Sequence, residues 1–256
     1  MLKALIFDVD GTLADTEEYH RLAFNESFAQ AGLEWDWSVA LYDELLGVTG
    51  GRERIKHFIQ QQHPNFAEEE KIDDLEDYIQ GLHKVKTVLF NEKLEQGLVS
   101  LRPGVERLIT EVHKHGIRLA IATTTTMENV TTLISCTLGK ASLAWFEVIV
   151  AGNMVAAKKP ASDVYDAVLS QLSLPASECI ALEDSQLGLK SALAAGITTI
   201  VTQNHFTRTH DFQNAALVIN HLGEPELAFE VLQGNAYGHQ YVDLAMLEDI
   251  YSHTQA

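Results

Sequence analysis

Two aspartates two residues apart carry the strongest chemical signal in the sequence. Asp8 and Asp10 follow the apolar segment 4–7, and Gly11 comes directly after them. Side chains at positions i and i+2 of an extended segment share a face, so both carboxylates can point into one crevice. Gly11 lets the backbone turn sharply and approach a bound group closely, which makes it a candidate substrate-binding residue.

An Asp-rich turn and a calcium-binding loop are the two simpler interpretations of this pattern. An EF-hand loop that began at Asp8 would need glycine at its sixth position and glutamate at its twelfth. Leu13 and Tyr19 occupy those positions, so a calcium loop fits poorly. These residues alone leave the Asp-rich turn open.

Polar residues that could do chemistry also follow or flank later apolar segments. They are Thr123, Lys159, Glu183 and Asp184. Taken singly, each has an ordinary explanation as a helix cap or a solvated surface charge. Taken together, they supply the hydroxyl, ammonium and carboxylate groups that one phosphoryl-transfer site requires.

A carboxylate can attack phosphorus only where a cation offsets the repulsion between two anions. The sequence therefore predicts Mg²⁺ bound by oxygen ligands. We expect Asp8, the backbone carbonyl of Asp10 and the Asp184 side chain to hold this metal, with Glu183 assisting.

The same residues predict the order of the chemical steps. Asp8 is the expected nucleophile and would form an aspartyl-phosphate, which divides one difficult hydrolysis into two easier steps. Asp10 would protonate the leaving oxygen and then take a proton from the attacking water. Lys159 and the Thr123 hydroxyl would bind the equatorial oxygens, where charge resides in the transition state.

Short apolar segments, too continuous for half-exposed strands, predict the scaffold that brings these groups together. They span residues 4–7, 119–122, 148–150, 180–182, 199–201 and 217–219. Such segments suit a buried parallel sheet, and helical periodicity separates most of them. The predicted fold is α/β, a doubly wound parallel sheet with a Rossmann-like core. Ligands of such sheets bind at the carboxyl ends of the strands.

The alternation of strand and helix stops between residues 16 and 97, which show helical periodicity and heavy charge. We interpret this segment as an inserted helical cap domain. Residues 1–15 and 98–230 would form the core domain, and residues 231–256 a helical tail attached to it. Asp15 is expected to cap the first cap helix, with Glu18 completing a capping box.

Composition excludes several classes of partner and compartment. The net charge of -18 disfavours binding to nucleic acid or to an anionic membrane surface. The two cysteines cannot form a disulfide framework, and no apolar run has the length of a membrane span. We therefore expect a cytoplasmic protein, and the phosphoryl-transfer residues predict that its partner is a small phosphorylated metabolite. The expected oligomeric state is a monomer, although no motif specifies it.

The ordered motifs resemble those of the haloacid dehalogenase superfamily. The matching segments are 8–12, Thr123, Lys159 and 183–184. The resemblance covers nearly the whole chain to about residue 220, and it implies that the helical insert is the family's small cap, which closes over the site. Segments 15–20, 49–55, 122–125 and 158–160 are most similar to CbbY-type sugar-bisphosphate phosphatases. That similarity implies xylulose 1,5-bisphosphate as substrate and xylulose 5-phosphate as product.

Further substrate-binding candidates lie mostly in the insert. Glu17 begins the first cap helix, and His20 lies one turn along it, where a structural role is equally open. Gly50 and Gly51 form a flexible loop before Arg52, whose guanidinium suits bidentate binding of a second phosphate. The remaining candidate, Thr124, follows the predicted catalytic threonine.

Two other functions stay open at this stage. The β-phosphoglucomutases share Asp10, Thr16 and His20, but they carry a lysine where this chain has Leu46. The difference favours a phosphatase, although another cation of the cap could replace that lysine. A non-enzymatic receiver-like module switched by aspartate phosphorylation is the weaker alternative, because it would be about half as long and would not need a cap.

Overall fold

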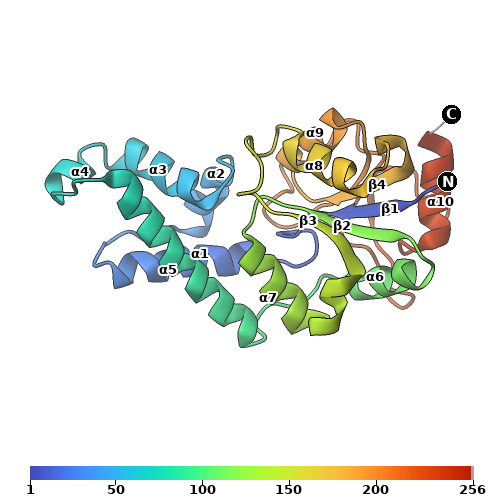
Figure 1. Cartoon of the computed structure of the whole chain (residues 1–256), viewed down its shortest axis with the longest axis horizontal. Coiled ribbons are helices and arrows are strands. Elements are labelled where there is room, and N and C mark those ends of the chain that lie inside the picture. Colours follow the sequence, from blue (N-terminus) through green and yellow to red (C-terminus); the bar gives the residue numbers. More distant parts are fainter. Residues whose placement is uncertain (255–256) are drawn as a thin grey trace. The chain divides into compact units, whose positions relative to one another are not determined.

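The computed structural model describes residues 1–254, and the chain divides into two compact units (Figure 1). The first, called the core unit, contains Met1–Asp15 and the chain from Val99 onward. The second, called the cap unit, is Thr16–Leu98. The chain therefore leaves the core once, after its first strand, and returns once.

The core unit is built from alternating strands and helices. Its elements are β1 (Ala4–Phe7), α6 (Val105–Lys114), β2 (Arg118–Ala122), α7 (Met127–Thr137), β3 (Phe146–Val150), α8 (Asp163–Leu172), β4 (Cys179–Glu183), α9 (Gln186–Ala194), β5 (Thr198–Thr202), β6 (Leu217–Ile219), β7 (Val231–Gly234) and α10 (Leu244–Thr254). Two 3₁₀ turns, Lys140–Trp145 and Ala176–Glu178, precede β3 and β4. All six predicted strands are present.

The seven strands form one sheet in the order β3-β2-β1-β4-β5-β6-β7. β1 lies between β2 and β4, and Ala4 pairs with both Arg118 and Cys179 in parallel register. The strand order reverses direction on either side of β1, so the predicted doubly wound fold is confirmed. At such a reversal the loops after neighbouring strands diverge and open a crevice for a ligand.

Side chains alternate between the two faces of the sheet. Ala4 and Ile6 of β1 join a buried cluster with Val164 and Val168 of α8, and Ala192 of α9 belongs to the same cluster. Figure 1 shows α8 and α9 on one face of the sheet and α6 and α7 on the other. Helices thus cover both faces, which explains why the central strands are apolar without interruption.

The C-terminal tail differs from its predicted helical character. Its first residues form β7, an edge strand that pairs antiparallel with β6, and only Leu244–Thr254 is helical. All four residues of β7 are exposed, so this strand lacks the buried apolar pattern that marks the other six. The sheet is therefore mostly, rather than wholly, parallel.

The cap unit consists of five helices around an aromatic centre. The helices are α1 (Glu17–Gln30), α2 (Val39–Leu45), α3 (Gly51–Gln62), α4 (Phe66–Glu69) and α5 (Leu75–Glu95). Phe24 and Phe28 of α1 pack against Trp37, whose ring also contacts Phe58 of α3. Large aromatic rings bury much apolar area per residue, so this small unit has a core of its own.

The predicted helix cap at Asp15 is wrong. Thr16 is the N-cap residue of α1, and its side chain makes no capping hydrogen bond. The Asp15 carboxylate instead lies 3.2 Å from the guanidinium of Arg102, on the segment that returns to the core. Glu18 pairs with Arg21 one turn along α1 and does not complete a capping box.

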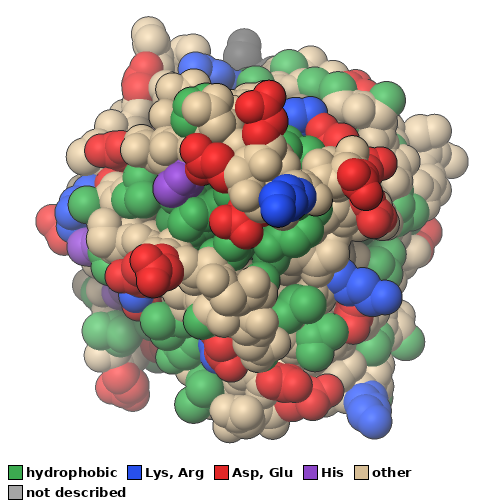
Figure 2. All heavy atoms as spheres, turned by 90° about the vertical axis from the view of Figure 1, so that its left-hand side faces the viewer, with side chains coloured by type: hydrophobic (Ala, Val, Ile, Leu, Met, Phe, Trp, Pro, Cys, Tyr) green, Lys and Arg blue, Asp and Glu red, His purple; other side chains and the backbone are tan. Residues whose placement is uncertain are grey.

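Charged side chains of both signs lie on the face of the molecule that Figure 2 draws. On the face drawn in Figure 2, acidic side chains are spread widely and basic side chains lie singly between them. This distribution agrees with 36 acidic against 18 basic residues in the chain. Among residues 1–254, no helix is long and apolar enough to cross a membrane.

Candidate active site

The predicted catalytic groups follow the ends of adjacent strands in the core unit. Asp8 follows β1, Thr123 follows β2, and Glu183 ends β4 with Asp184 next to it. All four side chains are buried, as is that of Lys159 in the loop before α8. Because β1 lies between β2 and β4, these strand ends meet at one edge of the sheet.

Lys159 lies at the centre of this group. Its Nζ donates hydrogen bonds to Asp8 Oδ1 and to Glu183 Oε1, both at 2.6 Å. A third bond, of 3.0 Å, goes to the carbonyl of Ala122, the residue before Thr123. One buried ammonium therefore connects β1, β2 and β4, which are far apart in the sequence.

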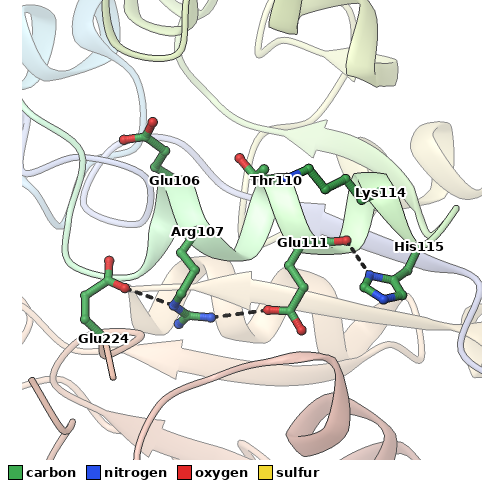
Figure 3. Close-up of a pocket in the computed structure, with 7 residues that line it drawn as sticks. All are labelled: Glu106, Arg107, Thr110, Glu111, Lys114, His115 and Glu224. Carbon is green, nitrogen blue, oxygen red and sulfur yellow. Dashed lines mark hydrogen bonds and ion pairs between the residues drawn. The ribbon is translucent and has the colours of Figure 1, made fainter. Parts of the chain in front are cut away.

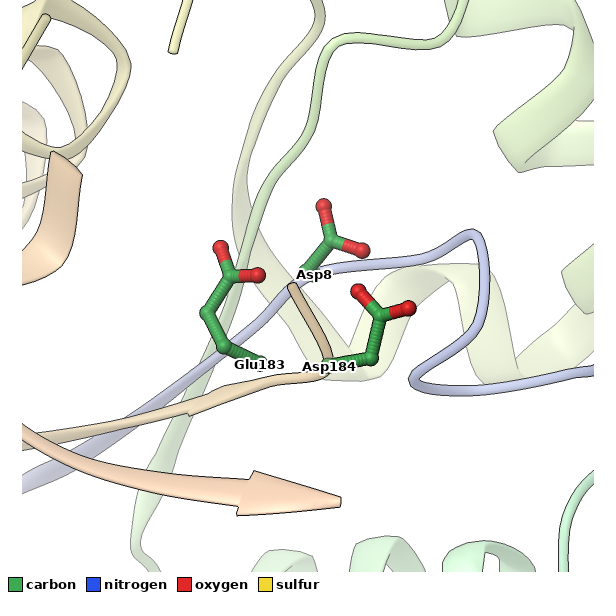
Figure 4. A group of neighbouring side chains, drawn as sticks. All are labelled: Asp8, Glu183 and Asp184. Carbon is green, nitrogen blue, oxygen red and sulfur yellow. The ribbon is translucent and has the colours of Figure 1, made fainter. Parts of the chain in front are cut away.

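Three carboxylates of the site could hold a metal ion. One oxygen from each of Asp8, Glu183 and Asp184 lies within 4.8 Å of the others. Figure 4 shows these three side chains as neighbours. Glu183 Oε2 is buried and has no hydrogen-bond partner among the described residues, as expected of an oxygen whose ligand is an ion or a water. An all-oxygen, acidic donor set suits Mg²⁺ better than a softer metal.

Asp10 is not among these three carboxylates. Its backbone forms an isolated parallel bridge with Ala14, inside the turn that follows β1. The predicted metal ligand at Asp10 is its backbone carbonyl, and that assignment stays a prediction.

Burial and charge shift the pKa values of this group. Burial raises the pKa of Asp8 to about 8, Lys159 opposes the rise, and Glu183 adds to it. Burial alone would lower the pKa of Lys159, but the Asp8 and Glu183 carboxylates outweigh it and raise that pKa. Lys159 therefore stays charged, whereas the Asp8 carboxyl can take up a proton near neutral pH.

The turn after β1 requires glycine. Gly11 has a φ of +81°, and a methyl group there would lie 2.1 Å from Asp184 Oδ2. Its backbone amide donates to the carbonyl of Ala14 at 2.8 Å, which closes the turn. The turn thus lies directly against Asp184, and any side chain at Gly11 would displace that carboxylate.

Thr123 and Thr124 lie beside the strand end without capping a helix. The Thr123 hydroxyl is buried and accepts a hydrogen bond from the Thr125 amide at 3.2 Å, whereas Thr126 caps α7. The loop after β3 packs tightly here, since a methyl group at Gly152 would lie 2.3 Å from the Thr124 carbonyl. The role of a helix cap is therefore excluded for Thr123.

Tyr165 of α8 is a member of the site that the sequence did not reveal. Its buried hydroxyl donates to Glu183 Oε1 at 2.5 Å, and Lys159 Nζ lies 5.3 Å from its ring centre. Burial, followed by the Glu183 charge, raises the pKa of Tyr165, so the phenol stays neutral and donates. In the sequence Tyr165 is one more residue on the buried face of a helix, with no signal of a polar partner.

Arg102 is a second residue that the sequence did not single out. Its guanidinium donates to the carbonyls of Gly11, Thr202, Gln203 and Asn220. The guanidinium also pairs with Asp15. Arg102, on the segment that returns to the core unit, is thereby bonded both to the segment that leaves it and to the turn after β1. Burial lowers the pKa of this arginine, but its acidic neighbours oppose the shift and it stays charged.

Within the cap unit, Glu17 and His20 are both engaged. Glu17 accepts a hydrogen bond from the Tyr42 hydroxyl at 2.8 Å. His20 is buried, stacks on Phe90 with ring centres 3.8 Å apart, and has its Nδ1 2.7 Å from Lys86 Nζ. Lys86 is therefore a buried cation of the cap unit. It is a candidate for the cap cation that could take the place of the lysine that β-phosphoglucomutases carry where this chain has Leu46.

The glycine-rich loop of the cap leads into α3. Gly50 has a φ of +99°, and a methyl group at Gly51 would lie 2.4 Å from the imidazole of His83, so both positions need glycine. Arg52 is exposed, whereas Arg54 is buried and donates to the Leu45 carbonyl at 3.1 Å. Of these two arginines, only Arg52 has a guanidinium available to a ligand.

A surface hollow of about 510 Å³ lies elsewhere on the core unit, along α6 (Figure 3). Arg107 in this hollow pairs with Glu224 at 2.9 Å and with Glu111 at 3.4 Å. It also donates to the carbonyls of Gly223 and Val242, so its guanidinium joins α6 to the C-terminal segment. None of the predicted site residues lines this hollow, and the guanidinium of Arg107 is already paired with two carboxylates.

Comparison with known proteins assigns the class of this enzyme. Residues 5–202 match the model of the haloacid dehalogenase-like hydrolase family. The chain belongs to that family, and the prediction that it is an enzyme, a phosphatase of the haloacid dehalogenase type, is confirmed.

CbbY proteins are among its relatives. The plasmid-borne CbbY protein of Cupriavidus necator is 45% identical over 247 residues, which cover 96% of this chain and 95% of that protein. A CbbY variant from Rhodobacter sphaeroides, crystallised with xylulose-1,5-bisphosphate, is 43% identical with a TM-score of 0.79 and covers 85% of this chain and 93% of that one. A β-phosphoglucomutase from Clostridium difficile shares the fold, with a TM-score of 0.74 at 18% identity, and covers 100% of this chain and 99% of that one.

Proposed function

We propose that this protein is a Mg²⁺-dependent phosphatase that hydrolyses xylulose 1,5-bisphosphate to xylulose 5-phosphate through an aspartyl-phosphate on Asp8. One observation carries the reaction class. Lys159 holds the Asp8 carboxylate beside two further carboxylates, so a nucleophile, a cation and metal ligands share one buried site. Phosphoryl transfer by a carboxylate needs this combination.

The proposed roles follow from the contacts. Asp8 attacks phosphorus and becomes the phosphorylated residue, while Lys159 and the Thr123 hydroxyl neutralise and bind the phosphoryl oxygens. Asp10, two residues along the same turn, gives a proton to the leaving oxygen and later takes one from water. Bound Mg²⁺ would be held by Asp8, the Asp10 carbonyl and Asp184, and it would offset the charge that the phosphoryl group brings.

Two lines of support point to the sugar bisphosphate. A relative of 43% identity was crystallised with xylulose-1,5-bisphosphate, and this chain covers 93% of it. In the cap unit, Arg52 has an exposed guanidinium at the start of α3, suited to a second phosphate. Glu17, His20, Gly50, Gly51 and Thr124 complete the proposed substrate-binding set, and a cytoplasmic monomer stays our prediction.

A product analysis separates the phosphatase from a sugar phosphomutase. The protein is incubated with xylulose 1,5-bisphosphate and Mg²⁺, then assayed for inorganic phosphate and, by mass spectrometry, for the sugar products. Equimolar phosphate and xylulose 5-phosphate are expected. An isomeric bisphosphate or monophosphate without release of phosphate would instead identify a mutase.

The nucleophile is tested by Asp8→Asn. The amide keeps the size of the side chain but is a far weaker nucleophile, so turnover should fall by about a thousandfold or more while the fold is retained. Asp211→Asn is a matched control, because Asp211 is exposed and its Oδ1 accepts a bond from the Gln213 amide that asparagine can also accept. Substantial turnover by a folded Asp8→Asn protein would remove Asp8 from the role of nucleophile.

A further inference from the structure

Asn204 lies in the loop after β5, beside the proposed metal site. β5 is the neighbour of β4 in the sheet, and Val201 pairs with Glu183. The Asn204 side chain therefore reaches back to Asp184, the residue that follows β4. Its Nδ2 donates to Asp184 Oδ2 at 2.7 Å and makes a longer contact of 3.4 Å with the Gly11 carbonyl.

The hydrogen bond made by the side-chain oxygen of Asn204 fixes the orientation of its side-chain amide. Asn204 Oδ1 accepts a hydrogen bond from the Phe206 amide at 2.9 Å. The backbone N–H of Asn204 donates to the Thr207 hydroxyl, also at 2.9 Å. Only one of the two possible flips of the side-chain amide satisfies the Phe206 N–H, so the NH₂ group must face Asp184.

We propose that Asn204 is a positioning residue that holds the Asp184 carboxylate in the orientation required for divalent-metal binding. This inference rests on the proposed function, which makes Asp184 a metal ligand. A carboxylate rotates freely about its last bond unless something holds it. The Asn204 NH₂ group donates to Asp184 Oδ2 and so limits the rotation of that carboxylate.

The turn after β1 supports the same role from the opposite side. A methyl group at Gly11 would lie 2.1 Å from Asp184 Oδ2 and 2.6 Å from Asn204 Nδ2, so the turn packs against the very bond that joins these two side chains. Asp184 is thus held between a hydrogen-bond donor and a backbone turn. Partners of this kind typically change metal affinity tenfold to a hundredfold when they are removed.

The test is a calorimetric titration of the whole protein with MgCl₂. Asn204→Ala should weaken Mg²⁺ binding by about tenfold or more. Asn204→Ser should do the same, since its hydroxyl can still accept the Phe206 N–H but is too short to reach Asp184. Asn220→Ala is the matched control: Asn220 follows β6 and its Oδ1 accepts the Glu230 amide at 2.9 Å, so its loss should leave Mg²⁺ affinity unchanged.

Phosphate release provides a second measurement. In both Asn204 variants the Mg²⁺ concentration for half-maximal rate should rise by the same factor, while the rate at saturating Mg²⁺ stays within a few-fold of wild type. Mg²⁺ affinity equal to that of wild type in either variant would overturn the role of Asn204 alone. Failure of both variants to fold would also overturn it, by making Asn204 a structural residue. Absence of Mg²⁺ binding by the wild-type protein would overturn the metal site, and with it the proposed function.

Discussion

Replacing Gly188 by alanine tests how tightly the site holds Glu183. Gly188 lies in the first half of α9, where its backbone packs against the buried Glu183 side chain. A methyl group there would lie 1.8 Å from Glu183 Oε2 and 2.2 Å from Cδ. No rotation of the methyl group relieves such an overlap, so the carboxylate itself must move.

The size of the effect follows from what Glu183 would lose. In an unhindered helix interior, Gly→Ala stabilises by about 1 kcal/mol. Displacing the carboxylate breaks its bonds to Lys159 Nζ and Tyr165 Oη, and a hydrogen bond to a charged group contributes about 1.5–3 kcal/mol. Loss of both bonds, less the helical gain, gives a net destabilisation of about 2–5 kcal/mol.

Scanning calorimetry is the appropriate assay, because it can resolve separate transitions of the core and cap units. Gly188→Ala should lower the transition of the core unit and reduce phosphate release, since Lys159 loses one of its two carboxylate partners. Gly81→Ala provides the matched control. Gly81 is also inside a helix, α5, but a methyl group there would meet no atom within 4 Å. That variant should be stabilised by about 1 kcal/mol and remain fully active.

The comparison of the two glycines can fail in a clear way. If Gly188→Ala were as stable and as active as Gly81→Ala, the close packing of α9 on Glu183 would be wrong. The bonds from Lys159 and Tyr165 to Glu183 would then not hold this carboxylate in place.

Three further predictions concern charge. Burial raises the pKa of Asp8 to about 8, so between about pH 4 and pH 8 the metal-free folded state keeps a proton that the unfolded state releases. The melting temperature of the metal-free protein should therefore fall as the pH rises through this range. Added Mg²⁺ should reverse the fall. A melting curve independent of pH would contradict that pKa. Lys159→Met should abolish turnover and destabilise the metal-free protein by about 3–5 kcal/mol at neutral pH, measured by urea denaturation, because Asp8 and Glu183 lose their cation. Arg52→Ala should reduce kcat/KM tenfold or more for the sugar bisphosphate but little for an aryl phosphate. The control Lys56→Ala, on the same helix, should leave kcat/KM for both substrates unchanged. Equal losses on both substrates in Arg52→Ala would exclude Arg52 from recognising the second phosphate.

Much of the core could be predicted because its signals are local. Each parallel strand contains a short apolar segment, and polar residues mark the ends of β1, β2 and β4. The order of strands along the chain was therefore sufficient to infer a shared edge. β7 gave no such signal. Val231 and Leu232 are exposed, and the strand is stabilised by pairing with β6, a contact that spans more than ten residues of intervening chain.

The residues that the sequence did not reveal share one physical property. Tyr165, Arg102 and Asn204 have polar groups whose partners are 18, 91 and 20 residues away, as in the bonds to Glu183, Gly11 and Asp184. Nothing in the neighbouring sequence distinguishes such a tyrosine from an ordinary core residue. Asp15 failed as a predicted cap for the same reason, because a distant arginine provides a stronger partner than the helix end.

The charge balance of the site links the proposed metal to the protonation of Asp8, the proposed nucleophile. Asp8, Glu183 and Asp184 bring three carboxylates. Among residues 1–254, Lys159 is the one cation that bonds to both Asp8 and Glu183, so full ionisation leaves an excess of negative charge in a buried place. Burial and this excess both raise the pKa of Asp8, so at neutral pH the metal-free site retains a proton on the carboxylate of the proposed nucleophile. A divalent cation would replace that proton, because it favours the ionised carboxylate. The metal would then be required twice, to accommodate the substrate's charge and to keep Asp8 in its nucleophilic form, and the apparent Mg²⁺ affinity should therefore increase with pH up to about 8.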